Sequence, residues 1–234
     1  MMRIAVFSDF HGNLEALQAI ISDIKSKNFD EIICLGDVLS LGPNPRECLE
    51  LIMNYNIKMV LGNHEMYYLN DLSKYNDVGE GERKHLEWVK NALSDKHYNY
   101  LKSQDIVYGF TEISNFLFMH FPYDYDNDDF YPLSNLTNSN RDEMFKSYDA
   151  DIIMIGHEHK RLEFNIGNKK IYCLGSSGCT KTFKTHYTMI EIDKFVSIKR
   201  VELDFDRETF EKKLNDIEYP EKEFLASVFF NYIV

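Results

Sequence analysis

The sequence predicts an α/β fold in which a parallel sheet presents its functional residues along one edge. Short apolar runs alternate with amphipathic helical segments through the first 60 residues, which is typical of a parallel sheet covered by helices. Beyond about residue 160 the pattern changes to strands joined by tight turns, which predicts antiparallel pairing. We therefore expect a second sheet to pack behind the first.

The first strand and the first helix follow from residues 3–25. Ile4, Val6 and Phe7 fit a strand that is buried on both sides. Gly12 permits a tight turn, and Asn13 is a good N-cap for the segment that follows. The apolar residues of that segment recur at helical spacing and predict an amphipathic helix. They are Leu14, Leu17, Ile20, Ile21 and Ile24.

Two further apolar runs have the character of the first strand. Residues 32–35 end in Gly36-Asp37, and residues 57–61 end in Gly62-Asn63-His64-Glu65. Between them, Gly42-Pro43-Asn44-Pro45 predicts a loop that leads into a helix. Since the carboxyl ends of parallel strands open on one edge of a sheet, we expect the polar residues after these runs to lie together.

The middle of the chain predicts a helix, a strand pair and a loop. Residues 81–104 have helical spacing, with Trp88 expected to pack and with His85 and His97 expected to be solvated. Strands are expected over residues 106–110 and 113–119, the second ending at His120. Residues 121–140 are rich in Asp, Asn and Tyr and predict a solvated loop, with an extra cation site or a lid over a substrate as alternatives.

The last third predicts one more buried strand and then antiparallel strands. A short helix over residues 141–148 precedes a strand over 151–155, which runs into Gly156-His157-Glu158-His159. Antiparallel strands are expected over residues 161–166, 170–174, 187–192 and 196–203. Residues 207–234 have helical spacing, and we expect them to supply packing or oligomer contacts and no chemistry.

Length and composition favour one domain over residues 1–234, with a core of about 3–204 and a helical extension of about 207–234. A formal net charge of −12 argues against a general binder of nucleic acid or membrane surfaces. No segment has the length of an apolar membrane span, and no signal-peptide pattern is present. The four scattered cysteines predict reduced thiols in a cytoplasmic protein.

Polar residues of metal-ligand type follow five of the predicted strands. Asp9 and His11 are two apart, so extended backbone would project both to one side, and His157 and His159 repeat this spacing. Each residue alone has an ordinary explanation, such as a helix cap or a histidine satisfied in the interior. Together they indicate a site for a transition metal such as Mn, Fe or Zn. The remaining members are Asp37, Asn63, His64 and His120.

In this order the residues resemble the signature of the calcineurin-like metallophosphoesterases. That signature runs Asp-x-His, Gly-Asp, Gly-Asn-His-Glu or Asp, a strand-terminal His, and Gly-His-x-His, and all five blocks are present. The similarity spans about residues 3–204. It includes Gly175-Ser176-Ser177-Gly178, which is similar to the Gly-Ser-x-Gly turn of the small bacterial phosphodiesterase branch.

The resemblance implies a four-layer α/β-β/α sandwich of two packed mixed sheets with helices outside. It also implies two divalent or mixed-valence transition metal ions, drawn from Mn, Fe, Zn, Ni and Co. The implied ligands are Asp9, His11 and His159 for one ion and Asn63, His120 and His157 for the other, with Asp37 bridging the two.

The resemblance further implies hydrolysis by a metal-bridging hydroxide. His64 would be a catalytic residue beside Asp37, binding a phosphate oxygen or protonating the leaving group. Glu65 would orient His64 or a metal ligand.

The expected substrate is a small phosphorylated molecule such as a phosphodiester, a nucleotide or a dinucleoside polyphosphate. Many small members of the family have Gly after the strand-terminal His, whereas Phe121 follows His120 here and could narrow the site or stack on a base. The candidate substrate contacts are Asn13, Asn44, Arg46, Phe121 and Lys181.

Three alternatives to this function stay open. They are a protein phosphatase, a nuclease of the DNA-repair type, and a non-catalytic scaffold like the phosphoesterase-like subunit of retromer. The acidic charge counts against the nuclease, and the complete set of ligand residues counts against the scaffold. The expected partners are thus a small phosphorylated substrate, no membrane and no nucleic acid, with homo-oligomer contacts through the C-terminal helices as a further option.

Overall fold

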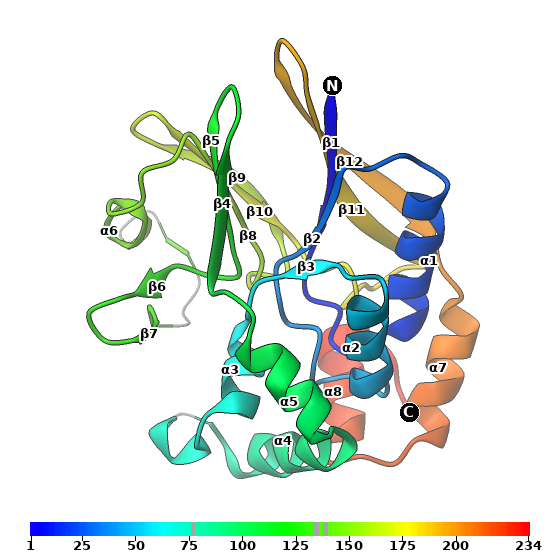
Figure 1. Cartoon of the computed structure of the whole chain (residues 1–234). Helices are drawn as coiled ribbons and strands as arrows, with labels where there is room; N and C mark the ends of the chain where they lie inside the picture. The colour runs from blue at the N-terminus through cyan, green and yellow to red at the C-terminus, as the bar shows by residue number, and fades with distance from the viewer. Residues whose placement is uncertain (76–77, 133–135, 138–139) are drawn as a thin grey trace.

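Two five-stranded sheets pack face to face at the centre of the fold (Figure 1). The computed structural model describes residues 1–75, 78–132, 136–137 and 140–234. The first sheet has the order β12-β11-β1-β2-β3 and consists of β1 (Met2–Phe7), β2 (Glu31–Cys34), β3 (Lys58–Met59), β11 (Lys184–Ile192) and β12 (Val196–Asp204). The second has the order β4-β5-β8-β10-β9 and consists of β4 (Val107–Thr111), β5 (Asn115–Met119), β8 (Ile152–Ile155), β9 (Arg161–Ile166) and β10 (Lys169–Leu174).

Both sheets are mixed, and each has a parallel centre. Strand β1 pairs in parallel with β2 and antiparallel with β11. Strand β8 pairs in parallel with both β5 and β10. The predicted antiparallel pairing after residue 160 is confirmed for β9 with β10 and for β11 with β12. The prediction is wrong for β10, which also pairs in parallel with β8, and for β11 and β12, which join the first sheet and not a separate one, because strand periodicity does not report which neighbour a strand pairs with.

Helices cover the first sheet and gather at the carboxyl ends of the parallel strands (Figure 1). The outer face of the first sheet packs on α1 (Leu14–Lys25), α2 (Pro45–Asn54) and α7 (Arg207–Asp216). Near the carboxyl edge lie α3 (Asn63–Leu69), the 3₁₀ turn η1 (Leu72–Lys74), α4 (Glu80–Ala92), α5 (Asp95–Lys102) and α8 (Lys222–Phe230). The outer face of the second sheet packs on α6 (Arg141–Phe145) and on the hairpin of β6 (Tyr123–Asp124) and β7 (Asp129–Phe130).

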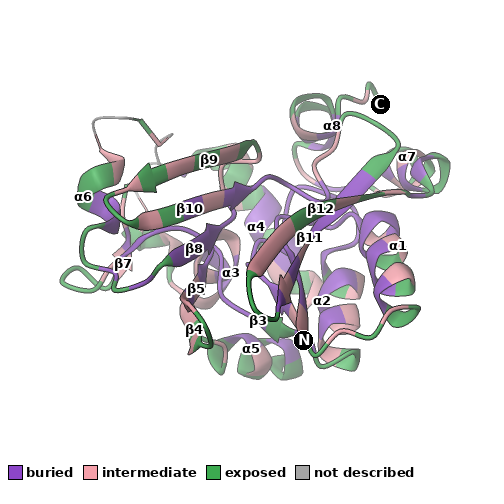
Figure 2. Cartoon of the chain, turned by 90° about the horizontal axis from the view of Figure 1, so that it is seen from above, coloured by how far each residue is buried: buried purple, intermediate pink, exposed green. Residues whose placement is uncertain are grey.

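The buried residues separate into layers because successive side chains of a strand point to opposite faces. Ile4 and Val6 of β1 pack between the sheets with Met154 of β8. Phe7 packs on the helices, while Ile153 packs on the opposite outer side. Figure 2 shows β8 buried along its length and the edge strands β9 and β12 partly exposed. The four-layer α/β sandwich is thus confirmed, and its fourth layer is the thin one made by α6 and the hairpin.

Some local predictions are wrong. The helix predicted over residues 81–104 is two helices, and Ser94 begins the second. His85 and His97 are buried, at 2% and 5% exposed, and not solvated. Segments that are distant in sequence cover both rings. The hydrophobic spacing within one helix cannot predict burial by such segments. The predicted loop over 121–140 contains the β6–β7 hairpin, and its residues 133–135 and 138–139 lie outside the described residues.

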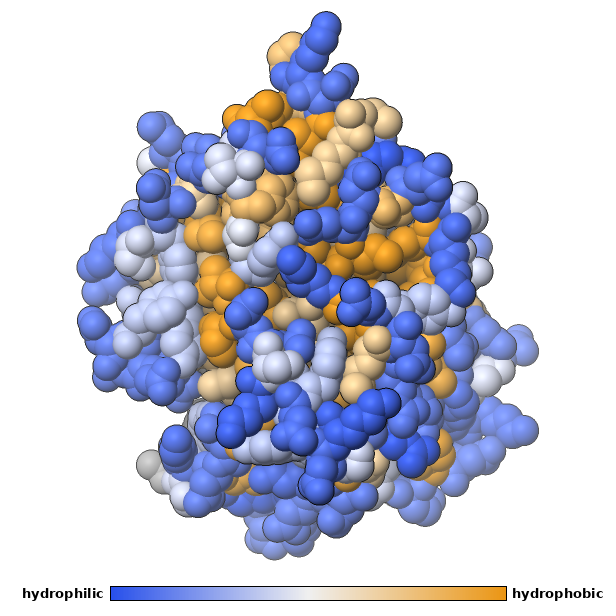
Figure 3. All heavy atoms as spheres, in the orientation of Figure 1, coloured by the Kyte–Doolittle hydropathy of each residue, from blue (hydrophilic) through white to orange (hydrophobic). Residues whose placement is uncertain are grey.

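Hydrophilic residues cover most of the face seen in Figure 3, and hydrophobic residues show between them nearer the centre. Within the described ranges, no helix has both the length and the apolar character needed to cross a bilayer.

Candidate metal centre

All seven predicted metal ligands lie together where the parallel strands of both sheets end. The Nε2 atoms of His11 and His159 are 3.0 Å apart. His120 Nε2 lies 3.2 Å from Asp37 Oδ2. The remaining members join the same cluster, since the amide oxygen of Asn63 is 3.1 Å from ring nitrogens of both His120 and His157, and Asp9 Oδ1 is 3.4 Å from His159 Nε2.

The backbone that brings these side chains together differs from the predicted one. Strand β1 ends at Phe7, and Asp9 and His11 have φ angles of 58° and 48°. His157 and His159 have φ angles of 66° and 53°. These are left-handed conformations, which residues other than glycine rarely adopt and which cluster at functional sites. The prediction that each pair points to one side through extended backbone is therefore wrong in its geometry.

Backbone hydrogen bonds between loops hold these strained conformations. The N–H groups of Asp9 and His11 donate to the carbonyl oxygens of Gly36 and Asp37, each at 3.0 Å. Asp37 itself has a φ of 52°. The loop after β1 and the loop after β2 thus form one unit, and the unfavourable φ angles are fixed by that pairing.

The Glu65 side chain supports the second of these paired loops through hydrogen bonds to its backbone. Its fully buried carboxylate accepts hydrogen bonds from the N–H groups of Asp37, Val38 and Leu39 at 2.8, 3.0 and 3.1 Å, and from Gly62 N–H at 3.0 Å. Burial and the nearby Asp37 carboxylate raise the pKa of Glu65 to about 7. Glu65 therefore holds the main chain of the Asp37 loop, which is more specific than the predicted role of orienting His64 or a ligand.

Two imidazoles are oriented as metal-binding histidines usually are. His120 Nδ1 lies 2.8 Å from the carbonyl oxygen of Leu35, and His11 Nδ1 lies 3.2 Å from that of Leu39. A carbonyl can only accept, so each Nδ1 carries the hydrogen. In the neutral rings, each Nε2 then presents a lone pair to the centre, and this is the arrangement that outer hydrogen-bond partners impose on ligand histidines.

The donor set fits a transition metal. In the described part of the chain, Asp9 Oδ2 is buried and has no hydrogen-bond partner. Among the residues that the structure describes, potential ligand atoms within 4.8 Å of one another occur in three groups, and Asp37 and His11 each belong to two of them. These groups are His11-Asp37-His64, Asp37-His120-His157 and His11-His159-Cys179. Mixed carboxylate and imidazole donors are suited to Mn, Fe, Co, Ni and Zn.

The charges of the metal-free cluster compensate one another. Burial opposes protonation of His120, but the Asp37 carboxylate outweighs it and raises the pKa of this imidazole to about 9. The pKa of Asp37 lies well below its usual range because His120 and His64 outweigh the effect of burial. Burial and the neighbouring His120 lower the pKa of His157 to about 4. A bound cation would take the place of the protons that now balance the carboxylates.

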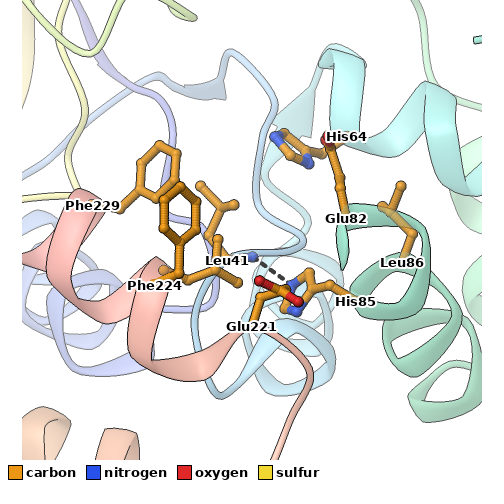
Figure 4. Close-up of a pocket in the computed structure, with 9 residues that line it drawn as sticks. Leu41, His64, Glu82, His85, Leu86, Glu221, Phe224 and Phe229 are labelled. Atoms are coloured by element: carbon orange, nitrogen blue, oxygen red, sulfur yellow. Dashed lines mark hydrogen bonds between the residues drawn. The ribbon is translucent and has the colours of Figure 1, made fainter. Parts of the chain in front are cut away.

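A cavity of about 210 Å³ opens beside His64. Figure 4 shows Phe224 and Phe229 of α8 with Leu41 on one side of it, and His64 and Leu86 on the other. The Phe229 ring centroid lies 5.9 Å from that of His159. The C-terminal segment therefore forms a wall of the centre, whereas the sequence predicts only packing or oligomer contacts for it. The same segment also packs on the core through Phe210 and Phe230.

A second cavity, of about 450 Å³, adjoins His159, and its charged lining includes Glu202, which pairs with Arg200, and Lys184, which pairs with Asp204. Arg161, Lys181, Lys184 and Arg200 contribute to its lining. Lys181 therefore lies near the centre, as expected of a substrate contact. Arg46 does not line either cavity. Its guanidinium is half exposed and pairs with Glu47 at 3.0 Å.

The other candidate substrate contacts are buried. Asn13 is confirmed as a helix cap, accepting from Ala16 N–H at 3.1 Å and donating to the Gly178 carbonyl at 2.8 Å. Phe121 is fully buried, with its ring centroid 4.6 Å from that of His157, so it packs behind a predicted ligand and presents no face to a base. Asn44 is also buried.

Comparisons with known proteins agree with this geometry. The model of the family described as calcineurin-like phosphoesterase matches residues 2–161. An uncharacterized protein of Methanocaldococcus jannaschii is 39% identical over 106 residues, which cover 44% of this chain and 42% of that protein. The symmetrical bis(5'-nucleosyl)-tetraphosphatase of Haemophilus ducreyi is 34% identical over 70 residues, which cover 29% of this chain and 26% of that protein.

The chain thus matches less than half the length of either curated relative. The crystal structure of a metallophosphoesterase from Sphaerobacter thermophilus has the same fold, with a TM-score of 0.73, 22% identity and 97% of both chains covered. The family match extends over more than half of the chain and includes all seven predicted ligands together with His64. The chain therefore belongs to the calcineurin-like phosphoesterase family.

Proposed function

We propose that the chain is a metal-dependent hydrolase that cleaves phosphoester or phosphoanhydride bonds of a small substrate. The observation that carries this proposal is the convergence of seven donor side chains at one edge of two sheets. Two transition metal ions would be held, one by Asp9, His11 and His159 and one by Asn63, His120 and His157. Asp37 would lie between them. Bound there, the ions would polarise phosphoryl oxygens and supply an activated water.

His64 is the residue best placed to act on the substrate directly. Its Nε2 lies 3.9 Å from Asp37 Oδ2. Its side chain is 12% exposed and lines the 210 Å³ cavity that α8 also lines. Its Nδ1 is buried and has no hydrogen-bond partner among the described residues. A ring in this position can bind a phosphoryl oxygen or protonate the leaving group.

The two cavities favour a substrate with two chemically different ends. The cavity beside His64 is lined by Leu41, Phe224 and Phe229 and also carries Glu82 and Glu221. Aromatic and apolar side chains suit a base, and carboxylates accept hydrogen bonds from amino or hydroxyl groups. In the cavity beside His159, Arg161 and Lys181 would suit a further phosphate, although Lys184 and Arg200 pair with carboxylates and the chain as a whole has a net charge of −12. A nucleotide has both ends, a dinucleoside polyphosphate carries a base on either side of its phosphates, and the named activity of the Haemophilus ducreyi relative supports this class.

The test is hydrolysis by the metal-reconstituted protein of a panel of substrates. The panel contains bis-p-nitrophenyl phosphate, mononucleotides, dinucleoside polyphosphates, phosphopeptides and single-stranded DNA. We expect metal-dependent turnover that is fastest with nucleotides or dinucleoside polyphosphates. Fastest turnover of phosphopeptides or DNA would favour a protein phosphatase or a nuclease. Absence of turnover with every substrate, despite stoichiometric metal, would favour a scaffold.

A further inference from the structure

A thiol lies at the edge of the candidate metal centre on the side of His159. Potential ligand atoms of His11, His159 and Cys179 all lie within 4.8 Å of one another. Resemblance to the family signature assigns no role to Cys179.

The turn that carries Cys179 is fixed to the backbone of a predicted ligand. Ser176 Oγ donates to the Asp9 carbonyl at 2.7 Å and accepts from the Cys179 N–H at 2.7 Å. The Gly178 N–H donates to the same Asp9 carbonyl at 3.1 Å. A Cβ atom on Gly178 would lie 2.0 Å from the carbonyl oxygen of Phe10, so only glycine permits this approach. The position of the thiol is therefore set by the backbone that also positions Asp9 and His11.

The other cysteines have different surroundings. Cys34, Cys48 and Cys173 are 0%, 0% and 1% exposed, whereas Cys179 is partly exposed. Cys173 directs its thiol to backbone carbonyls, with Lys160 O at 3.1 Å. Among the described residues, no potential metal-binding group includes any of these three.

The neighbouring carboxylate supplies a second and independent indication of a cation. Asp9 is fully buried, and its Oδ2 has no hydrogen-bond partner in the described part of the chain. Its Oδ1 lies 3.4 Å from His159 Nε2. The Asp9 carboxylate thus lies beside two of the three members of the His11-His159-Cys179 group, and carboxylate, imidazole and thiolate are all ligands of zinc in proteins.

We propose that Cys179 is a thiolate ligand of the metal ion held by Asp9, His11 and His159. Binding would form a sulfur–metal bond, break the S–H bond and release the proton to solvent. A thiolate is a soft donor, so this position would select Zn, Fe or Co over Mn and Mg. The proposal rests on the metal site of the proposed function and not on the substrate or the reaction.

The test is the absorption spectrum of the cobalt-loaded protein, with Cys179→Ser and with Cys173→Ser as the matched control. We expect the wild type and the control to show a thiolate-to-cobalt charge-transfer band that Cys179→Ser lacks. Loss of an outer partner of a metal ligand already weakens binding 10–100-fold, so Cys179→Ser should weaken cobalt affinity by at least about 10-fold. Cobalt content is measured by mass spectrometry on each sample.

A second measurement uses the wild type alone and does not depend on how the variant folds. Cys179 should react with an aromatic disulfide reagent in the chelated protein and be protected when cobalt is bound. Bound cobalt without a charge-transfer band and without protection would overturn the role of Cys179 and leave the metal site intact. Failure of the wild type to bind cobalt, zinc or iron would overturn the metal site and the thiolate ligand together.

Discussion

The Nε2 atom of His85 accepts a hydrogen bond from the backbone N–H of Leu41 at 2.8 Å (Figure 4). The opposite ring nitrogen, Nδ1, lies 3.2 Å from the carbonyl oxygen of Pro220, to which it donates. One buried imidazole thus joins α4 to the loop after Asp37 and to the segment before α8. These three parts of the chain surround the cavity beside His64, so the shape of that cavity depends on a neutral His85.

Protonation of His85 should destabilise the fold in mild acid. Burial lowers its pKa from 6.5 to about 4. The folded state therefore binds this proton less well than the unfolded chain, and the corresponding stability is complete above pH 6.5 and lost as the pH falls towards 4. The loss is about 3 kcal/mol at 1.36 kcal/mol per pKa unit. Urea unfolding between pH 7.5 and 4 measures it. His85→Gln should flatten this pH dependence, and equal slopes for the two proteins would refute the assignment.

Glu65→Ala should destabilise the chain strongly, because four backbone N–H groups would lose their buried acceptor. At about 1–3 kcal/mol for each unpaired group, we expect a loss of more than about 3 kcal/mol in the free energy of unfolding. Metal affinity should fall as well, since Glu65 positions the Asp37 loop. Denaturant unfolding and metal analysis test this. Glu163→Ala, at an exposed position on β9, is the control. A loss below about 1 kcal/mol would contradict the described role of Glu65.

Asp37→Asn should release metal and abolish turnover. An amide has no charge to share between two cations, and Asp37 is the carboxylate that belongs to two of the groups of potential ligands found among the described residues. We expect turnover to fall by more than about 100-fold, since loss of an outer partner alone costs 10–100-fold. Metal content after dialysis and phosphodiester hydrolysis are the measurements, with Asp149→Asn on the surface as the control. Turnover that survives both this substitution and chelation would exclude the proposed chemistry.

His64→Ala separates catalysis from metal binding. As a group that contacts substrate, His64 should contribute about 10²–10⁴-fold to turnover, while the metal content stays that of the wild type. Potential ligand atoms of His64, His11 and Asp37 lie within 4.8 Å of one another, so the structure also allows the opposite result, in which His64 holds a metal ion. Loss of one metal equivalent in the variant would make His64 a ligand. Turnover and metal content are measured on the same preparation.

Phe229→Ala should weaken the binding of nucleotide substrates. If the α8 wall stacks on a base, its removal should cost about 1–3 kcal/mol, or about 5- to 150-fold in KM. The kcat of a substrate without a base should change little. Phe195→Ala is the matched control, because Phe195 is 82% exposed on the turn between β11 and β12. An unchanged KM for nucleotides would place the base elsewhere.

The convergence of the candidate ligand residues at one edge of the sheets could be predicted from the sequence. Apolar runs that end in Asp9, Asp37, Asn63, His120 and His157 mark strand ends, and parallel strands bring such ends to one edge. The same reasoning gave the wrong local geometry at Asp9 and His157. Extended backbone follows from strand periodicity, whereas left-handed backbone depends on hydrogen bonds to loops far away in the chain.

The sequence by itself indicated an α/β fold with a parallel sheet, because this follows from local periodicity, and its similarity to the family signature indicated the four layers and the candidate donors. Only the tertiary structure decided the role of Glu65, the burial of His85, the approach of Cys179 to His159 and the place of α8 beside the centre. Each of these rests on contacts between segments that are distant in sequence. Such contacts depend on how the layers pack, and hydrophobic spacing within one segment does not encode that packing.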